Sequence, residues 1–367
     1  MEWNWQRQDW PNFRFDLAAT ESLEKQFLLQ SGKLLGASCH LSDEDQDQIR
    51  VQLLSDEALL TSRIEGEILD RASLQSSLQR QLGLSADSRR VSPAERGVSE
   101  LVVDGYRGFD QELTLERILK WHRLLMQGRG DIEVGAFRSG GDPMRIVSGP
   151  IHDPRVHYEA PPAADVIREM QGFMNWWNGV GRSLPCLARA SVAHLYFESI
   201  HPFEDGNGRI GRALSELAVS QSIGKPVILS LSRVIDSKRT AYYDALARGS
   251  RTLVIDDWVA YFSKALLEAQ VLSLRSVEFL IGKARFFDRL DRQINARQEK
   301  ALLRMFREGV DGFQGGLSAS NYRAITKAGT ATTTRDLAAL VEIGALRRTG
   351  ERKHARYHLN LSAPSSD

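Results

Sequence analysis

Residues 201–212 read His-Pro-Phe-Glu-Asp-Gly-Asn-Gly-Arg-Ile-Gly-Arg. The segment before them, residues 187–200, carries apolar residues at helical spacing, so a helix is predicted to run into this stretch. Pro202 lacks an amide donor and should end that helix. A second helix is predicted to begin near Asn207 and to end at Gly224. The sequence therefore predicts two helices joined by a glycine-rich turn.

This turn has the properties of an anion-binding site. Gly206 and Gly208 let backbone amides come close to a ligand, and free amides at a helix N-terminus favour negative charge. Arg209 and Arg212 are three positions apart, so they share one face of the first helical turn. Positive charge there opposes the helix dipole, which is unfavourable for stability but suited to phosphate binding. A capped helix with a solvated arginine face would explain each residue alone, but not the whole set.

Two further side chains of the turn can carry chemistry. Asp205 offers a hard oxygen ligand, which suits a Mg²⁺ ion that arrives with a phosphate group. His201 lies on the other side of the turn and is a candidate general base.

The twelve residues match the Fic family pattern HxFx(D/E)GNGRxxR at every fixed position. A motif of this length is far more specific than a lone GxGxxG. The chain therefore resembles the Fic proteins, which mostly transfer AMP from ATP to a hydroxyl group of a target protein (AMPylation) on an all-helical core. The expected fold is mainly α: a Fic-type helical core with a β-hairpin flap, an N-terminal helical region and a C-terminal winged helix.

The resemblance implies a role for each residue of the motif. His201 would deprotonate the Ser, Thr or Tyr hydroxyl of the target, and Asp205 would hold Mg²⁺ between the α- and β-phosphates of ATP. Arg209 and Arg212 would hold the β- and γ-phosphates. The anion hole would be formed by Gly206, Asn207 and Gly208, and the nucleotide-binding segment would also include Ile210 and Gly211.

A second informative string is Thr-Ser-Arg-Ile-Glu-Gly at residues 61–66. Gly66 suits the position just after a helix, and Glu65 near a helix C-terminus is unfavourable unless it has a partner. The string fits the Fic inhibitory motif (S/T)xxxE(G/N). By resemblance, Glu65 would pair bidentately with Arg212, occupy the guanidinium that the γ-phosphate needs and leave ATP misaligned. The resemblance thus implies an autoinhibited, class II Fic protein.

The composition of the chain limits which other classes of protein it could belong to. The 367 residues suffice for two or three domains, and a net charge of +1 provides no general attraction for nucleic acid or membranes. Two cysteines, Cys39 and Cys186, fit a reducing cytosol and exclude a cysteine-rich zinc site. The first residues lack a signal-peptide pattern, and no apolar run is long enough to span a bilayer. We therefore expect a cytoplasmic protein without a membrane partner.

Four regions are expected along the chain. They are an N-terminal helical domain with the inhibitory helix, the Fic catalytic core, a helical connector and a winged-helix-like domain, at residues 1–100, 101–275, 276–296 and 297–360. In the first region, helical periodicity covers residues 21–35 and 43–62. The aromatic residues near the N-terminus are expected to dock onto the body of the protein, namely Trp3, Trp5, Trp10, Phe13 and Phe15.

The core is predicted to be helical apart from one hairpin. Residues 144–148 and 155–158 alternate around a Gly/Pro turn, which predicts a β-hairpin, and the resemblance implies a flap that holds the target by strand addition. Tyr242 and Tyr243 lie on a predicted helix, and by resemblance one of them, preferably Tyr243, stacks on adenine. The remaining core helices are expected at residues 113–126, 164–177 and 258–274.

A metal-dependent hydrolase is disfavoured by the sequence. His152 and Asp153 lie in the predicted hairpin turn, where Asp is usual turn chemistry. His194 and His201 are too far apart for the zinc pair of HExxH.

The C-terminal region is predicted to begin with a long helical connector, residues 266–296. Helices follow at 300–307, 320–328 and 332–343, the last capped by threonines, and then a basic hairpin. This order resembles a winged helix. The residues that would lie on the wing, ready for phosphates, are Arg347, Arg348, Arg352, Lys353 and Arg356.

Whether this region reads DNA is left open by the sequence. The candidate recognition helix carries Arg335, but also Asp336 and Glu342, so base readout from it would be sparse. Winged helices also serve as protein-docking modules.

The expected function is that of an autoinhibited protein adenylyltransferase. Its substrates would be ATP, bound with Mg²⁺, and a protein with an exposed hydroxyl group, and automodification is expected. The alternatives are a nucleotide-sensing, DNA-binding regulator and removal of AMP from a modified target by the same core. The intact His201 and Asp205 argue against a pure sensor. The oligomeric state is open, with a homodimer as one possibility.

Overall fold

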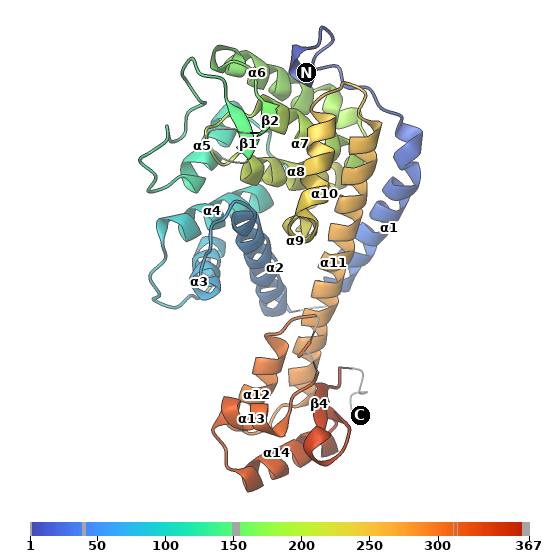
Figure 1. Ribbon diagram of the computed structural model, residues 1–367. Helices are drawn as coiled ribbons and strands as arrows, with labels where there is room; N and C mark the ends of the chain where they lie inside the picture. Colours follow the sequence, from blue (N-terminus) through green and yellow to red (C-terminus); the bar gives the residue numbers. More distant parts are fainter. Residues whose placement is uncertain (1, 39–41, 149–154, 311, 314, 362–367) are drawn as a thin grey trace. The chain divides into compact units, whose positions relative to one another are not determined.

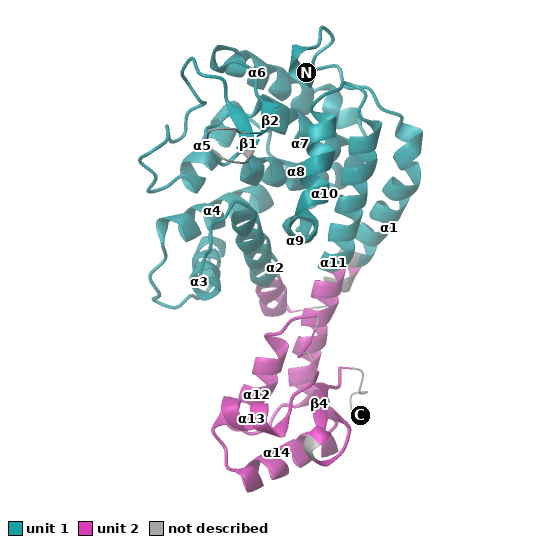
Figure 2. Ribbon diagram, viewed as in Figure 1, with its two compact units in different colours: residues 1–35, 50–273 teal, residues 36–49, 274–367 magenta. Residues whose placement is uncertain are grey.

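The residues that the computed structural model describes are 2–38, 42–148, 155–310, 312–313 and 315–361. They are mainly helical with two small two-stranded sheets, which confirms the predicted fold class (Figure 1). The chain divides into two compact units (Figure 2): residues 1–35 and 50–273 form unit 1, and residues 36–49 and 274–367 form unit 2. In the described ranges we find no helix with the length and apolar character needed to cross a membrane. The predicted domain boundaries stay a prediction.

Unit 1 is built from helices and one hairpin. Its helices are α1 (Glu21–Ser38), α2 (Asp43–Ile64), α3 (Arg71–Leu82), α4 (Pro93–Arg107), α5 (Leu115–Leu125), α6 (Val166–Asn178), α7 (Cys186–Ile200), α8 (Asn207–Ile223), α9 (Leu231–Ser237), α10 (Arg239–Gly249) and α11 (Asp256–Arg289). The ends of α1, α2 and α11 continue into unit 2. Short 3₁₀ turns lie at Asn4–Gln6, Leu17–Thr20, Ala163–Asp165, Val180–Ser183 and, in unit 2, Arg352–His354.

Helix α7 forms the centre of unit 1. All of its residues are buried, and it packs against α8 and α6. Its sequence is apolar or small on almost every side, as expected for a helix surrounded by others. Pro185 before it offers no side-chain cap, so Glu24 of α1 accepts hydrogen bonds from the amides of Leu187 and Ala188, at 2.7 and 3.1 Å. This packing fixes the C-terminal end of α7, where the motif begins.

The N-terminal aromatic residues dock onto unit 1, as predicted. The rings of Trp10 and Tyr196 meet edge to face at 5.2 Å, and Trp10 Nε1 donates to Glu169 at 2.7 Å. Trp3 meets the Tyr158 ring edge to face at 5.1 Å. These contacts place the first residues against the hairpin and α7.

The predicted hairpin is present. β1 (Arg145–Ser148) pairs antiparallel with β2 (Arg155–Glu159), with an irregularity between Ile146 and Val147. The Tyr158 hydroxyl donates to the carbonyl of Ser199, which anchors the hairpin to α7. The turn with His152 and Asp153 lies outside the described residues.

Several elements differ from the prediction. Helices α3 and α4 were not predicted, and residues 258–274 and 266–296 were expected as separate helices. Both ranges lie largely in one continuous helix, α11, which ends at Arg289, so residues 290–295 are not helical, although they were predicted to be. No proline interrupts α11, and Gly282 lies inside it without ending it. The core helices expected at 113–126 and 164–177 are confirmed as α5 and α6.

Unit 2 contains three short helices and a hairpin in the predicted order. They are α12 (Ala296–Phe306), α13 (Ala319–Thr326), α14 (Thr330–Glu342), β3 (Leu346–Thr349) and β4 (Arg356–Leu359). Leu302, Tyr322 and Leu340 belong to its buried core. The predicted threonine cap of α14 is wrong. The helix starts two residues earlier than expected, so the threonines lie inside its first turns and Gly329 precedes them without a side-chain cap.

Candidate active site

The loop between α7 and α8 holds the motif in a fixed conformation. His201 follows the last residue of α7 in the left-handed region (φ 49°), and Gly206 precedes α8 at φ 86°. The Asn207 side chain closes the loop: its carbonyl accepts from the Phe203 amide at 3.0 Å and its amino group donates to the Phe203 carbonyl at 2.8 Å. Asn207 therefore has a structural task for its side chain, which leaves only its backbone amide for a ligand.

Two residues outside the motif hold this loop. The Arg138 guanidinium donates to the carbonyls of His201 and Pro161 at 2.8 and 2.5 Å, and its backbone amide donates to Pro202 at 2.9 Å. His122 stacks on Phe203 with 4.0 Å between ring centroids. The sequence showed the Gly-Ala-Phe-Arg string that ends at Arg138 but not this role, and it gave no sign of His122.

His201 is nearly buried, with 12% of its side chain exposed. Burial and the nearby Arg138 lower the pKa of His201 to about 4, so its imidazole is neutral at pH 7. Its Nδ1 lies 3.8 Å from Oε2 of Glu198, whose pKa burial raises to about 8. Among the described residues, neither Nδ1 of His201 nor Oε1 of Glu198 has a hydrogen-bond partner. The site thus pairs a neutral imidazole with a protonated carboxyl group, a neighbour that sequence reasoning missed.

The N-terminus of α8 presents amides that no side chain caps. Glu65, just beyond the end of α2, lies against this terminus: a Cβ on Gly208 would overlap its Oε1. Gly208 therefore permits an anionic group to approach the backbone, and in this structure the group is the Glu65 carboxylate. Gly66 takes φ +85° and its amide bonds back to Arg63, as expected for the end of a helix.

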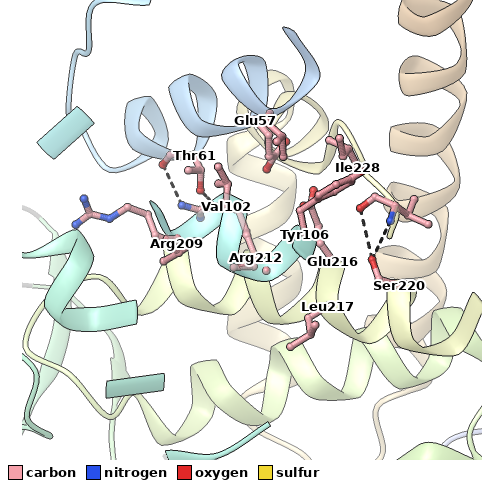
Figure 3. Close-up of a pocket in the computed structure, with 15 residues that line it drawn as sticks. Glu57, Thr61, Val102, Tyr106, Arg209, Arg212, Glu216, Leu217, Ser220 and Ile228 are labelled. Carbon is pink, nitrogen blue, oxygen red and sulfur yellow. Dashed lines mark hydrogen bonds between the residues drawn. The ribbon is translucent and has the colours of Figure 1, made fainter. Parts of the chain in front are cut away.

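Arg212 is buried beneath this carboxylate, with 2% of its side chain exposed. Its NH2 group donates to Glu65 Oε1 at 2.7 Å. The same NH2 group donates to the Thr61 carbonyl at 3.0 Å, and Nε donates to Thr61 Oγ1 at 2.8 Å (Figure 3). The Glu65 contact is therefore a single hydrogen bond, not the bidentate pair that was expected. The second donor that a bidentate pair would need is not free for Glu65, because Arg212 Nε donates to Thr61 instead. Burial alone would lower the pKa of Arg212, but Glu65 and Tyr242 raise it.

Arg209 points to a second carboxylate. Its NH1 group lies 2.7 Å from Glu67 Oε2, and its NH2 group lies 3.3 Å from Asp205 Oδ1. Only 2% of the Arg209 side chain is exposed, against 33% for Glu67. The segment after α2 therefore engages both arginines of the motif. Glu67 was not predicted, because the inhibitory pattern ends at Gly66.

Asp205 is the one candidate metal ligand of the motif. It is partly exposed and pairs with Arg129 at 2.9 Å as well as with Arg209. Burial would raise the pKa of Asp205, but Arg209 and Arg129 lower it. In the described ranges, no group of three or more His, Cys, Asp and Glu side chains is placed to hold a metal. One carboxylate suits Mg²⁺ that keeps its waters and is bound mainly by phosphates.

The two tyrosines of α10 have different surroundings. Tyr242 is buried, and its hydroxyl lies 2.7 Å from Nε2 of His194, so both are engaged in the core. Tyr243 is 47% exposed and lines a cavity of about 300 Å³ together with Ile146, Tyr158 and Glu198. This cavity lies between the hairpin, α7 and α10.

A second, smaller cavity of about 40 Å³ lies between α2, α4 and α8 (Figure 3). Its lining includes Arg212 and two acidic residues, Glu57 of α2 and Glu216 of α8. Burial raises the pKa of Glu57 to about 7, and Glu57 accepts hydrogen bonds from the Ser232 amide and hydroxyl. These contacts join α2 to α9, because Ser232 lies in α9. Ile210 and Gly211 are buried in α8 and face the protein interior.

The comparisons with known proteins agree with this architecture. The Fic/DOC family profile matches residues 112–219, and a domain of unknown function (DUF4172) matches residues 3–84. Protein adenylyltransferase Fic of Drosophila virilis is 34% identical over 136 residues, and protein adenylyltransferase fic-1 of Caenorhabditis elegans is 27% identical over the same length. The matched region is 37% of this chain and spans about a quarter of each relative, 25% and 24%.

Two crystal structures share the fold. A Fic family protein from Desulfovibrio desulfuricans superposes with a TM-score of 0.55 at 22% identity, covering 95% of this chain and 98% of that one. A Fic domain-containing signalling protein from Bacteroides thetaiotaomicron gives 0.52 at 19% identity, covering 70% and 97%.

The fold and the loop define a helical protein with an uncapped helix N-terminus beside a nearly buried histidine. The chain carries a domain of the Fic/DOC family, within which the motif loop and both of its arginines lie.

Proposed function

We propose that this chain is an autoinhibited protein adenylyltransferase, which transfers AMP from ATP to a Ser, Thr or Tyr hydroxyl of a protein. The main support is the position of the Glu65 carboxylate, which lies beside Gly208 in the first turn of α8 and accepts a hydrogen bond from Arg212. A carboxylate is an anion with two acceptor oxygens, so it stands in for a phosphate at the same donors. The names of the relatives agree with this activity.

In the proposed reaction, the target hydroxyl attacks the α-phosphorus of ATP and the bond to the β-phosphate oxygen breaks. The hydroxyl proton passes to the neutral imidazole of His201, and pyrophosphate leaves. A positioned base contributes roughly 10²–10⁴ in rate. Arg209, Arg212 and the amides of Gly208 and its neighbours would stabilise the charge on the phosphates. The buried setting strengthens these interactions.

Mg²⁺ would be held by Asp205 together with the phosphates. When bound, the ion would offset negative charge on the triphosphate. Asp205 would first have to exchange its ion pairs with Arg129 and Arg209 for this role. The freed guanidinium of Arg209 would then be available to a phosphate.

The cavity beside Tyr243 would receive the adenine base. It has about 300 Å³ and an exposed aromatic ring. Tyr242 is less suited to stacking, because it is buried and bonded to His194. The hairpin leaves Val147 and Val156 exposed at 50% and 38%, which suits a flap that adds a strand from the target.

Inhibition would follow from competition for Arg212. Glu65 takes one of its donors, so the γ-phosphate could not bind there while α2 keeps its place. Automodification is expected once this contact is lost, because hydroxyl groups of the chain itself are the nearest acceptors. The cytoplasmic location remains part of this proposal.

The experiment compares three forms of the full chain with labelled ATP and Mg²⁺: wild type, Glu65→Gly, and Glu65→Gly/His201→Ala. We expect Glu65→Gly to raise incorporation at least roughly tenfold, and the double variant to lose it by about 10²-fold or more. Isothermal titration with ATP shows that the double variant still binds nucleotide. Equal labelling of the first two would reject the inhibitory role, and labelling by the double variant would reject His201 as base.

Removal of AMP from a modified target is the alternative within the same site. It is tested by adding AMP-modified target to wild type and Glu65→Gly without ATP. If wild type releases AMP and Glu65→Gly does not, Glu65 supports hydrolysis and the proposal of simple inhibition is wrong.

A further inference from the structure

Unit 2 carries a positively charged surface that the proposed AMP transfer does not use. Residues 319–360 contain eight Lys and Arg against three Asp and Glu, although the whole chain has a net charge of only +1. The exposed basic side chains of this segment are Arg323, Lys327, Arg335, Arg347, Arg348 and Arg352. Within the described part of unit 2, none of these six pairs with a carboxylate. The charge is therefore available to an anionic partner.

Helix α14 contributes a face of small side chains to this surface. Thr333, Leu337 and Leu340 point into the core of unit 2. The opposite face is exposed and carries Ala331, Thr334, Arg335 and Ala338, with Glu342 at its C-terminal end. Small residues let a helix backbone approach a partner closely. A single arginine among them has a long side chain that extends beyond its small neighbours toward that partner. This pattern suits a helix that enters the major groove of DNA.

Of the two carboxylates that seemed to oppose DNA binding, Asp336 does not lie on this face. Asp336 is buried and accepts from the Tyr322 hydroxyl at 2.9 Å and from Arg297 Nε at 3.2 Å. It joins α12, α13 and α14 instead of facing solvent. Glu342 is exposed but is the last residue of α14, about three turns from the start of the helix.

The neighbouring elements fit the same partner. α13 and α14 are joined by only three residues, 327–329, as in a helix-turn-helix. β3 packs against α14, so Arg347 and Arg348 lie on the strand next to that helix. Arg352 lies in the connection between β3 and β4. Arginines beside a groove-sized helix can bind the phosphates that flank the groove.

We propose that the surface formed by α14 and the β3–β4 hairpin binds double-stranded DNA, with α14 in the major groove and the hairpin arginines on the backbone. A protein partner or a membrane fits less well. Among the described residues of unit 2, the large hydrophobic side chains that stand exposed are Val310 and Leu361, and neither lies on α14 or the hairpin. This proposal is independent of the proposed AMP transfer.

The test uses fluorescence anisotropy of the full chain with a labelled 30-base-pair duplex, titrated over a series of salt concentrations. We expect affinity to fall steeply with salt, because bound phosphates release counterions. Arg347→Ala/Arg348→Ala should weaken binding at low salt roughly tenfold or more and flatten the log–log salt slope by about two. Ala338→Glu should abolish binding, because it places a carboxylate on the face of α14 that meets DNA.

Two controls separate this surface from charge in general. Arg292→Ala/Lys300→Ala removes the same charge outside α13, α14 and the hairpin, and Ala296→Glu adds the same charge at the start of α12. Both controls should bind like wild type. Absence of binding at low salt, equal weakening by the controls, or unchanged binding by Ala338→Glu would each overturn the proposal. So would binding to anionic vesicles but not to the duplex. Circular dichroism verifies that each variant is folded.

Discussion

At the scale of single residues, the site depends on pairs of opposite charge that leave little room for a nucleotide. Arg212 is held by Glu65 and Thr61, and Arg209 is held by Glu67 and Asp205. In the proposed function, a triphosphate would have to displace carboxylates from both guanidinium groups. The sequence pattern pointed to the first pair only, yet the second is equally close in distance.

We therefore expect Glu67 to be a second, weaker inhibitory residue that lowers the affinity of the site for ATP. Replacing it by Gln in the Glu65→Gly background removes the charge that competes for Arg209, so ATP should bind more tightly. Glu67 is one-third exposed, and we expect a gain of roughly two- to five-fold, as for a partly screened ion pair. Calorimetric titration with ATP measures the change.

The matched control is Glu112→Gln, which removes an exposed carboxylate ahead of α5. It should leave ATP affinity unchanged. If both Gln variants tighten binding equally, the gain comes from net charge and Glu67 has no specific role.

The motif loop could be predicted from sequence far better than its supports. Many residues of 201–212 have a backbone or charge property from which a role can be predicted by position alone, such as Gly206 directly before a helix. His122 and Arg138 act through contacts with distant carbonyls and rings, and spacing along the chain does not reveal such contacts. The role of Glu198 could not be predicted for a different reason. Its pKa is raised by burial, and burial of this side chain follows from the fold and not from the local sequence.

At the scale of elements, the close packing of α4 on α5 requires one particular glycine. A Cβ on Gly97 would overlap the Leu124 carbonyl oxygen of α5, whereas a Cβ on Gly105 in the same helix would find its nearest neighbour, Trp121, at 4.0 Å. Gly97→Ala should destabilise the fold by about 1–3 kcal/mol. Gly105→Ala should be neutral or stabilising by up to about 1 kcal/mol, because alanine favours helix. Urea denaturation compares the two, and equal midpoints would contradict this account.

Element boundaries show what sequence reasoning can miss. Helix α4 begins with a capping box between Ser92 and Glu95 and with Pro93 in its first turn. The spacing of Ser92, Pro93 and Glu95 is a helix-start signal that the sequence itself contains, although apolar periodicity alone does not reveal it. The cap of α7 is a different case, because Glu24 lies more than a hundred residues upstream and local sequence contains no trace of it.

At the scale of the whole molecule, buried titratable groups set the pH dependence of stability. Burial raises the pKa of Glu57 to about 7 and that of Glu198 to about 8, from an ordinary value of 4.5. The folded chain then holds protons that the unfolded chain has lost, so stability decreases as pH rises through this range. Burial lowers the pKa of His122 and His201 to about 4, from 6.5, so stability also decreases as pH falls below 6.5.

Between pH 6.5 and 8.5 the carboxyl groups make the larger contribution, because histidines of the unfolded chain hold protons only near the lower end of this interval. We expect the free energy of unfolding to decrease over this interval by an amount on the order of 1–3 kcal/mol. Glu198→Gln should reduce that decrease, because its amide does not titrate, while Glu112→Gln should not. Chemical denaturation at pH 6.5 and at pH 8.5 measures this decrease in the free energy of unfolding. An identical decrease in wild type and Glu198→Gln would show that Glu198 does not titrate there.

The clamp made by Arg138 has a consequence for genetics. The Arg138 guanidinium donates to the carbonyls of His201 and Pro161, which lie in two separate segments. The backbone amide of Arg138 donates to the carbonyl of Pro202, next to His201. Lysine offers a single ammonium group and cannot span those acceptors with the same geometry. A screen for inactive variants should therefore return Arg138→Lys as often as changes to the histidine itself, although this arginine is not among the residues proposed to bind the nucleotide.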